Sequence, residues 1–369
     1  MGISLAIVCH FAANYYDFTR GDAALEYQVY LAIVNGNPMP FNSPSLLVSC
    51  LTTTWLPAMI QRLTHFDMDV LFRYYAIPLM VWSPFVVYLL AARFVTPFES
   101  FCVGLLYIAQ PYFVVAPMVS RIVIANTLLL LSILIPLQRR IPLAWKVVLL
   151  TVILGAMVVT AYSVTFLAVG LYAGWLLVGF VYGWRRRRIW KSLVPVGLML
   201  LIVVVASAFW LGFMTWLPWA LVKNLVRDTL TGAAVQNGMT SVVLGQTFWT
   251  MNNVQRFDFL ITWLVMGLIT LGLVLRAKRF SIGQAAGVAA YALLVVGVLI
   301  PALDAHFGIQ RVYFCVSGLL LIFLVYSIRW LAKLVKVSPC ISLAATTVVY
   351  AFVGSGLLYY TMGYDRFLH

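Results

Sequence analysis

The stretch SRIVIANTLLLLSILIPL, residues 120–137, decides the fold class. It is almost wholly apolar over the length that a helix needs to cross a bilayer core about 30 Å thick. Similar runs recur along the whole chain of 369 residues, of which 64% are hydrophobic and only 9% are charged. A soluble domain is close to half apolar and about a quarter charged, so this composition indicates a membrane protein.

Helices are the expected form of these apolar runs. The bilayer core cannot hydrogen-bond a backbone, so only helices and closed barrels span it. Barrel strands alternate polar and apolar residues, whereas these runs are apolar throughout. We therefore predict an all-α integral membrane protein with about eleven transmembrane helices. The spans are expected near residues 3–16, 71–92, 98–117, 120–137, 143–159, 161–183, 192–216, 257–275, 281–300, 311–330 and 340–362.

Charge patterning predicts the orientation of these helices. Most of the 24 Lys and Arg residues fall in short loops on one side, while Glu99 is the only one of the ten acidic residues expected there. The positive-inside rule makes that side cytoplasmic, together with the N-terminus. Residues 1–369 are read as a single polytopic domain in the cell membrane. Long extracytoplasmic loops cover 17–70 and 217–256, and the C-terminal helices cover 257–362.

Several classes of function are disfavoured by the composition. The net charge of +14 does not indicate nucleic-acid binding, because the basic residues form short clusters between hydrophobic runs. The cysteines show neither the CxxC spacing of a zinc site nor a disulfide framework. There is no Walker A loop, GxSxG elbow or HExxH motif. The five cysteines are Cys9, Cys50, Cys102, Cys315 and Cys340.

The first outer loop carries the most informative acidic residues. Gly21 permits a turn, and a helix is expected to start at Asp22, on which Asp22 and Glu26 share one face. Two adjacent carboxylates raise the pKa of one of them, which favours a general base. The alternative is that Asp22 only caps the helix and Glu26 is solvated. Residues 43–64 are read as a second helix, which lies either in the membrane interface with Trp55 at headgroup depth or against the bundle.

Polar residues also begin several predicted spans. Arg121 and Arg311 either reach the lipid headgroups or bind phosphate, for which a guanidinium is well suited. Tyr162 and Ser163 either hydrogen-bond a sugar or phosphate or join two helices.

These residues together resemble a known superfamily. An acidic first outer loop followed by many spans is similar to the GT-C fold glycosyltransferases, which include protein mannosyltransferases, aminoarabinose transferases and oligosaccharyltransferases. The closer resemblance is to a family of uncharacterised archaeal and bacterial multi-pass proteins placed in that superfamily. The residues that carry it are Gly21, Asp22, Glu26, Tyr27, Asn35, Gly36, Arg121, Tyr162, Ser163, Arg311 and Tyr313.

The resemblance implies transfer of a sugar from a polyprenyl-phosphate-linked donor to an acceptor glycan, lipid or protein on the extracytoplasmic face. Asp22 corresponds to the catalytic first-loop acid and would act as general base. Glu26 would orient Asp22 or help to hold a divalent cation, Mg²⁺ or Mn²⁺. Arg311, with Arg121 or His306, would stabilise the departing phosphate. The remaining candidates, expected to contact substrate, are Tyr27, Tyr162, Ser163 and Tyr313.

Two other functions remain open at the level of sequence. One is a polytopic transporter or a flippase for lipid-linked saccharides, which would perform no covalent chemistry. The scarcity of charged residues within the spans argues against an ion-coupled transporter. The other is a scaffold subunit of an envelope assembly whose outer loops bind a partner.

Overall fold

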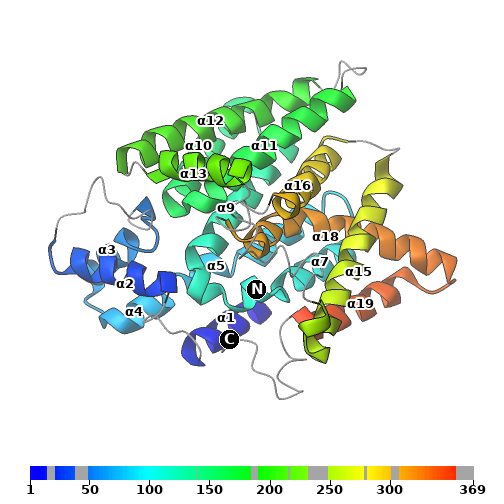
Figure 1. Cartoon of the computed structure of the whole chain (residues 1–369), viewed down its shortest axis with the longest axis horizontal. Helices are drawn as coiled ribbons and strands as arrows, with labels where there is room; N and C mark the ends of the chain where they lie inside the picture. Colours follow the sequence, from blue (N-terminus) through cyan, green and yellow to red (C-terminus); the bar gives the residue numbers. More distant parts are fainter. Residues whose placement is uncertain are drawn as a thin grey trace. The chain divides into compact units, whose positions relative to one another are not determined.

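A computed structural model shows a helical chain (Figure 1). Throughout the described residues the regular secondary structure is helical, with no β-strand. The structure describes residues 1–14, 21–37, 49–138, 140–183, 190–214, 217–231, 248–277, 281–300 and 307–354.

The helices follow the apolar runs of the sequence. The short helices α2 to α6 precede a series of longer ones, and two described 3₁₀ turns are η2 (Ala116–Val119) and η5 (Phe248–Thr250). The α-helices are α1 (Gly2–Asn14), α2 (Gly21–Val34), α3 (Trp55–Thr64), α4 (Met68–Tyr74), α5 (Ile77–Met80), α6 (Ser83–Ala91), α7 (Pro97–Ile108), α8 (Pro111–Val114), α9 (Ser120–Leu137), α10 (Leu143–Thr160), α11 (Tyr162–Gly183), α12 (Trp190–Met214), α13 (Leu217–Thr231), α15 (Asn253–Arg276), α16 (Ile282–Leu299), α18 (Ile309–Leu334) and α19 (Pro339–Gly354).

Among the described residues, seven helical segments are long and apolar enough to cross a membrane. The prediction of a helical, multi-pass membrane protein is therefore supported. The other predicted spans, at 3–16, 98–117, 281–300 and 340–362, coincide with apolar helices of 10–17 residues, so the count of eleven stays a prediction. The seven segments are Met68–Ala91, Ala116–Leu137, Leu143–Thr160, Tyr162–Tyr182, Leu193–Gly212, Gln255–Arg276 and Ile309–Leu334.

The segment predicted as one span over 98–117 is interrupted. Helix α7 ends at Ile108, and α8 begins at Pro111. A residue that precedes proline is disfavoured in the helical conformation, because the proline ring crowds its backbone. Gln110 occupies that position, which explains why the apolar run breaks there.

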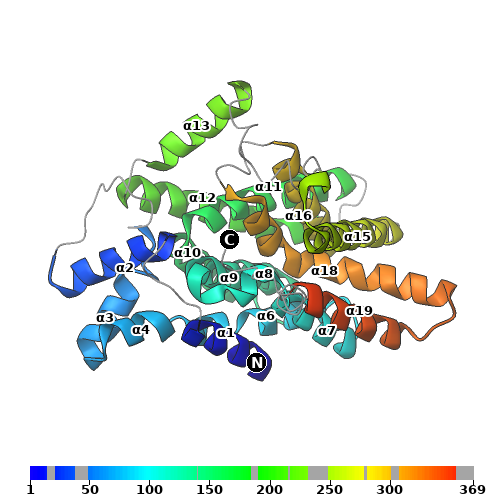
Figure 2. The same cartoon turned by 60° about the horizontal axis from the view of Figure 1, so that its bottom comes forward.

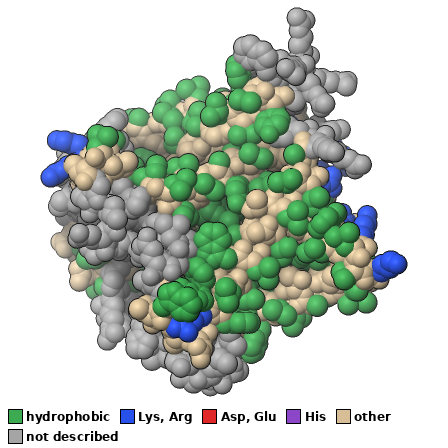
Figure 3. Space-filling view, turned by 45° about the vertical axis from the view of Figure 1, so that its right-hand side comes forward, with side chains coloured by type: hydrophobic (Ala, Val, Ile, Leu, Met, Phe, Trp, Pro, Cys, Tyr) green, Lys and Arg blue, Asp and Glu red, His purple; other side chains and the backbone are tan. Residues whose placement is uncertain are grey.

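The outer surface of the long helices fits a lipid environment. Helix α10 exposes Trp145, Val148 and Val152 to 62%, 51% and 65%. Figure 3 shows apolar side chains spread over one face of the molecule, with Lys and Arg side chains in only a few places. Such an apolar exterior would be unfavourable in water and is expected for helices that face lipid tails.

Backbone contacts divide the chain into two compact units, which are described separately. Unit 1 comprises Met1–Val86, Val115–Ala173 and Ser192–Val226. Unit 2 comprises Val87–Val114, Gly174–Lys191 and Arg227–His369. The single domain expected from the sequence stays a prediction.

In unit 1, the helices of the predicted first outer loop pack on one another. Helices α2, α3 and α4 lie together (Figures 1 and 2) and share a small core. That core contains Tyr30 from α2, Ala58 from α3 and Phe72 from α4. Helices are therefore present within 17–70, but α3 covers only Trp55–Thr64 of the helix expected over 43–64, and residues 51–54 form turns. The position of this segment relative to a membrane stays a prediction.

Unit 2 is built around the long helix α18, which packs on α15, α16, α7 and α19. Most of α18 is buried. The backbones of α15 and α18 approach closely where Gly272 faces Phe323. A Cβ atom at Gly272 would overlap the carbonyl oxygen of Phe323. Glycine is therefore required at this crossing.

Candidate functional site

A buried ion pair joins α2 to α9 in unit 1. Nη1 of Arg121 donates a hydrogen bond to Oε1 of Glu26. The side chains of Arg121 and Glu26 are only 3% and 8% exposed. No acid lies near Arg121 in sequence, and the structure supplies one from 95 residues away.

Cys50 lies beside this ion pair. Its side chain is almost wholly buried, and the charges of Arg121 and Glu26 both affect its thiol electrostatically. Burial raises the pKa of the Cys50 thiol to about 11, while Arg121 opposes the rise and Glu26 adds to it. The thiol is therefore neutral at physiological pH. The backbone N–H of Tyr162, the first residue of α11, donates to this sulfur.

Two buried hydroxyl groups lie close in sequence to these contacts. Ser163, which follows Tyr162, is 1% exposed, and its Oγ has no hydrogen-bond partner within the protein. Oγ1 of Thr52, two residues after Cys50, is also a buried atom without a hydrogen-bond partner within the protein. A buried hydroxyl without a partner costs about 1–3 kcal/mol. Each hydroxyl can still donate to a polar partner.

These residues gather at one end of three helices. Arg121 is in the first turn of α9, and Tyr162 and Ser163 are in the first turn of α11. Helix α10 runs antiparallel to α9, so its last residue, Thr160, lies at the same end as the start of α9. Helix α11 begins two residues later, at that same end. The backbone N–H of Leu51 donates to Val159 O at 2.8 Å and fixes the Cys50 segment there. We call the set of Glu26, Cys50, Arg121, Tyr162 and Ser163 the Arg121 cluster.

Tyr27 points away from Glu26 toward α4. Its hydroxyl donates to Asp69, and its ring packs against Phe72 with centroids 5.0 Å apart. Burial, and then the hydrogen bond to Asp69, raise the pKa of Tyr27 well above its ordinary value. The phenol therefore stays protonated and links α2 to α4. The structure gives Tyr27 this role in packing, and its predicted contact with substrate stays a prediction.

The remaining predicted site residues are in unit 2 or outside the described part. Arg311 is half-buried in the first turn of α18, and its Nε has no hydrogen-bond partner within the protein. The residue before this helix, Gly308, has a φ of 72°. The hydroxyl oxygens of Tyr313 and Tyr350 are 3.4 Å apart. His306 and the side chain of Asp22 fall outside the described residues, although the backbone of Asp22 lies in the first turn of α2.

Unit 2 has a partly buried ion pair of its own. Glu99 accepts hydrogen bonds from Nε and Nη2 of Arg329, and also from the backbone N–H of Thr96 at 2.8 Å. The pair joins the start of α7 to the last turns of α18. It contains none of the predicted site residues, and we assign it to the packing of these two helices.

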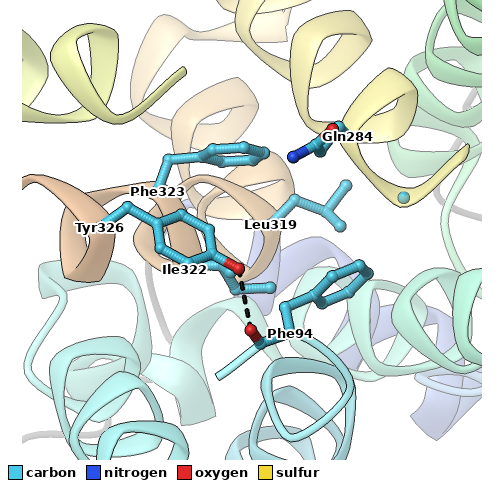
Figure 4. A pocket seen from close by; sticks show the side chains of 7 residues that line it. Phe94, Gln284, Leu319, Ile322, Phe323 and Tyr326 are labelled. Atoms are coloured by element: carbon cyan, nitrogen blue, oxygen red, sulfur yellow. Dashed lines mark hydrogen bonds between the residues drawn. The ribbon is translucent and has the colours of Figure 1, made fainter. Parts of the chain in front are cut away.

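A small cavity in unit 2 is also separate from the predicted site residues (Figure 4). Its volume is only about 10 Å³. The hydroxyl of Tyr326 donates to Phe94 O at 2.8 Å at its edge. The lining residues are Phe94, Gly283, Gln284, Leu319, Ile322, Phe323 and Tyr326. Because this lining is largely apolar, the cavity offers little to hold a sugar or phosphate.

The described side chains offer little support for a divalent cation. No group of three or more His, Cys, Asp or Glu side chains that could hold a metal ion is found among them. The charge of Glu26 is also already balanced by Arg121. The possible Mg²⁺ or Mn²⁺ stays a prediction, and no step of the proposed reaction below passes through a metal.

Comparison with known proteins found no matching family model and no matching curated protein. The geometry of the Arg121 cluster and the resemblance in the sequence are therefore the features that bear on function.

Proposed function

We propose that this chain is a GT-C-type glycosyltransferase. It moves a sugar from a polyprenyl-phosphate-linked donor to an acceptor hydroxyl at the extracytoplasmic surface of the cell membrane. The observation that carries the proposal is the Arg121 cluster, in which Glu26 pairs with Arg121 while Tyr162 and Ser163 begin α11 at the same end of the helices. The resemblance singled out the same residues from widely separated parts of the chain.

The proposed reaction is a direct displacement at the anomeric carbon. The acceptor oxygen forms a new bond to that carbon, and the bond from the carbon to the phosphate oxygen breaks with its electron pair leaving on the polyprenyl phosphate. The carboxylate of Asp22 takes the proton of the acceptor hydroxyl. Attack from the side opposite the phosphate inverts the anomeric configuration.

In this proposal Glu26 and Arg121 act as positioning residues. Asp22 lies one turn before Glu26, and residues four apart share a helix face. Anchoring Glu26 to Arg121 fixes the rotation and position of α2, and therefore the direction of its acidic face. This role replaces the direct contact with phosphate expected of Arg121, because its charge is already balanced by a buried carboxylate.

The unpartnered hydroxyls supply the polar contacts to substrate. Ser163 and Thr52 can each donate to a sugar hydroxyl or a phosphate oxygen. Arg311 remains the proposed ligand of the donor phosphate. It carries a guanidinium in the first turn of a long helix, where backbone N–H groups also favour an anion.

Replacement of the base tests this function. We expect Asp22→Asn to lower sugar transfer in proteoliposomes by at least about 10²-fold, because a positioned general base is worth about 10²–10⁴-fold. The substitution keeps the size of the side chain and removes its negative charge and its basicity. Asp228→Asn, on α13, is the matched control and should transfer at the wild-type rate. Near-normal transfer by Asp22→Asn would remove Asp22 from the mechanism.

A further inference from the structure

Helix α3 is apolar on two opposite faces. One face is buried and contributes Ala58 to the core that it shares with α2 and α4. The other face carries Trp55, Met59 and Leu63, which are 44%, 40% and 78% exposed. These residues recur every four positions and so form one stripe. Phe66, 62% exposed, follows just after the helix. We call Trp55, Met59, Leu63 and Phe66 the α3 stripe.

The place of α3 in the chain indicates what covers this stripe. The helix ends at Thr64, and Met68–Ala91, one of the segments long and apolar enough to cross a membrane, begins four residues later. The turn between them is tight, with His65 in the left-handed conformation and Asp67 capping α4. The stripe is therefore held next to the point where the chain enters the bilayer. An apolar helix face with tryptophan in that position is typical of the membrane interface.

Helix α3 is also fixed to the helix that carries the candidate acids. Nη2 of Arg62 donates to Ile33 O, near the end of α2, at 2.6 Å. From α2, the hydroxyl of Tyr27 donates to Asp69, and that of Tyr30 donates to Met68 O at 3.3 Å. With the shared core, these contacts make α2, α3 and α4 one body. The depth of α3 in the membrane therefore determines the depth of α2.

We propose that the α3 stripe inserts into the lipid interface and holds α2, with Asp22 and Glu26, at the level of the lipid phosphate groups. The partner is the bilayer itself, because the stripe comes just before a segment that is long and apolar enough to cross a membrane. The insertion of α3 is independent of the reaction, whereas its use in placing the acids rests on the glycosyltransferase proposed above.

Photo-crosslinking in proteoliposomes tests the insertion. A photoreactive amino acid replaces Met59 or Leu63 in the full chain, in vesicles of phosphatidylethanolamine and phosphatidylglycerol, and adducts are identified by mass spectrometry. We expect lipid adducts at both positions, at several times the level found with the same amino acid at Thr64, which is exposed outside the stripe. Adducts to a second copy or to another protein, or equal yields at all three positions, would overturn the proposal.

A second arm tests the depth of α2 without reference to activity. Leu25 is 49% exposed on α2 and is a suitable position for the same photoreactive group. In the Met59→Asp/Leu63→Asp background, we expect lipid adducts at Leu25 to fall at least about 5-fold, because charged side chains disfavour the interface. Thr64→Asp is the control background and should leave the yield unchanged. An unchanged yield at Leu25 in the double variant would show that the stripe does not set the depth of α2.

The activity arm separates the two proposals. If the wild-type chain transfers sugar, the double variant should lose at least about 10-fold in rate, while Thr64→Asp keeps it. Normal transfer by the double variant would refute the link between α3 and the acids. If no donor is used by the wild type, the glycosyltransferase proposal fails, and the crosslinking result still decides whether α3 inserts.

Discussion

Breaking the Glu26–Arg121 pair should destabilise unit 1 far more than removing both partners together. With side chains only 3% and 8% exposed, either charge left alone would be buried without compensation. Removal of one partner of a buried pair costs about 3–5 kcal/mol, whereas replacement of both by residues of similar volume is often close to neutral. We therefore expect Glu26→Gln and Arg121→Met each to cost about 3–5 kcal/mol of unfolding free energy.

A double-mutant cycle measures this coupling. Unfolding of the purified protein in mixed micelles is followed as the fraction of denaturing detergent rises, for the wild type, both single variants and Glu26→Gln/Arg121→Met. The double variant should lose less than the sum of the single variants by at least about 2 kcal/mol, because its neutral side chains leave no buried charge. Single effects that add to within about 0.5 kcal/mol would refute the ion pair and, with it, the anchoring of α2.

Two further stability predictions follow from the other buried groups. Arg329→Met should lower the free energy of unfolding less than Arg121→Met does in the same assay. Arg329 is 31% exposed, and Glu99 keeps its hydrogen bonds from Thr96. An equal or larger loss would contradict this account. The pKa of the Cys50 thiol is raised by burial from 9.0 to about 11, so folding favours the protonated form. That contribution is fully present below pH 9 and is lost as the pH rises through about 11. Cys50→Ala should therefore lose less stability than the wild type between pH 9 and 11, and parallel losses would contradict the assignment.

The sequence was sufficient to predict the fold class, because long apolar runs admit few alternatives in a bilayer. It also placed a helix start at Asp22 and a second helix over 43–64; the structure has α2 from Gly21, and α3 covers only Trp55–Thr64. The break after α7 was not predicted, although Pro111 is a recognisable signal for it. Because 98–117 is apolar almost throughout, it was predicted as a single span despite Pro111.

The contacts of the candidate site could be predicted only in part. Arg121 and Ser163 are polar residues at the starts of predicted spans, and Glu26 shares a predicted helix face with Asp22, so these three residue types were recognisable candidates. Their partners could not be predicted, because the acid that meets Arg121 is 95 residues away in the chain. Cys50 was missed entirely, since a lone cysteine without metal or disulfide spacing gives no signal of its own. Only the folded chain brings the backbone N–H of Tyr162 to its sulfur.

The fate of a labelled sugar tests the central claim most directly. The wild-type chain is reconstituted in proteoliposomes with polyprenyl-phosphate donors that carry different radiolabelled sugars, together with a mixture of hydroxyl acceptors from cell envelopes. We predict that at least one donor yields a covalent sugar–acceptor product, with an equal amount of polyprenyl phosphate released and the anomeric configuration inverted. Movement of intact lipid-linked sugar across the bilayer, with no product from any donor, would contradict the account and identify a transporter instead.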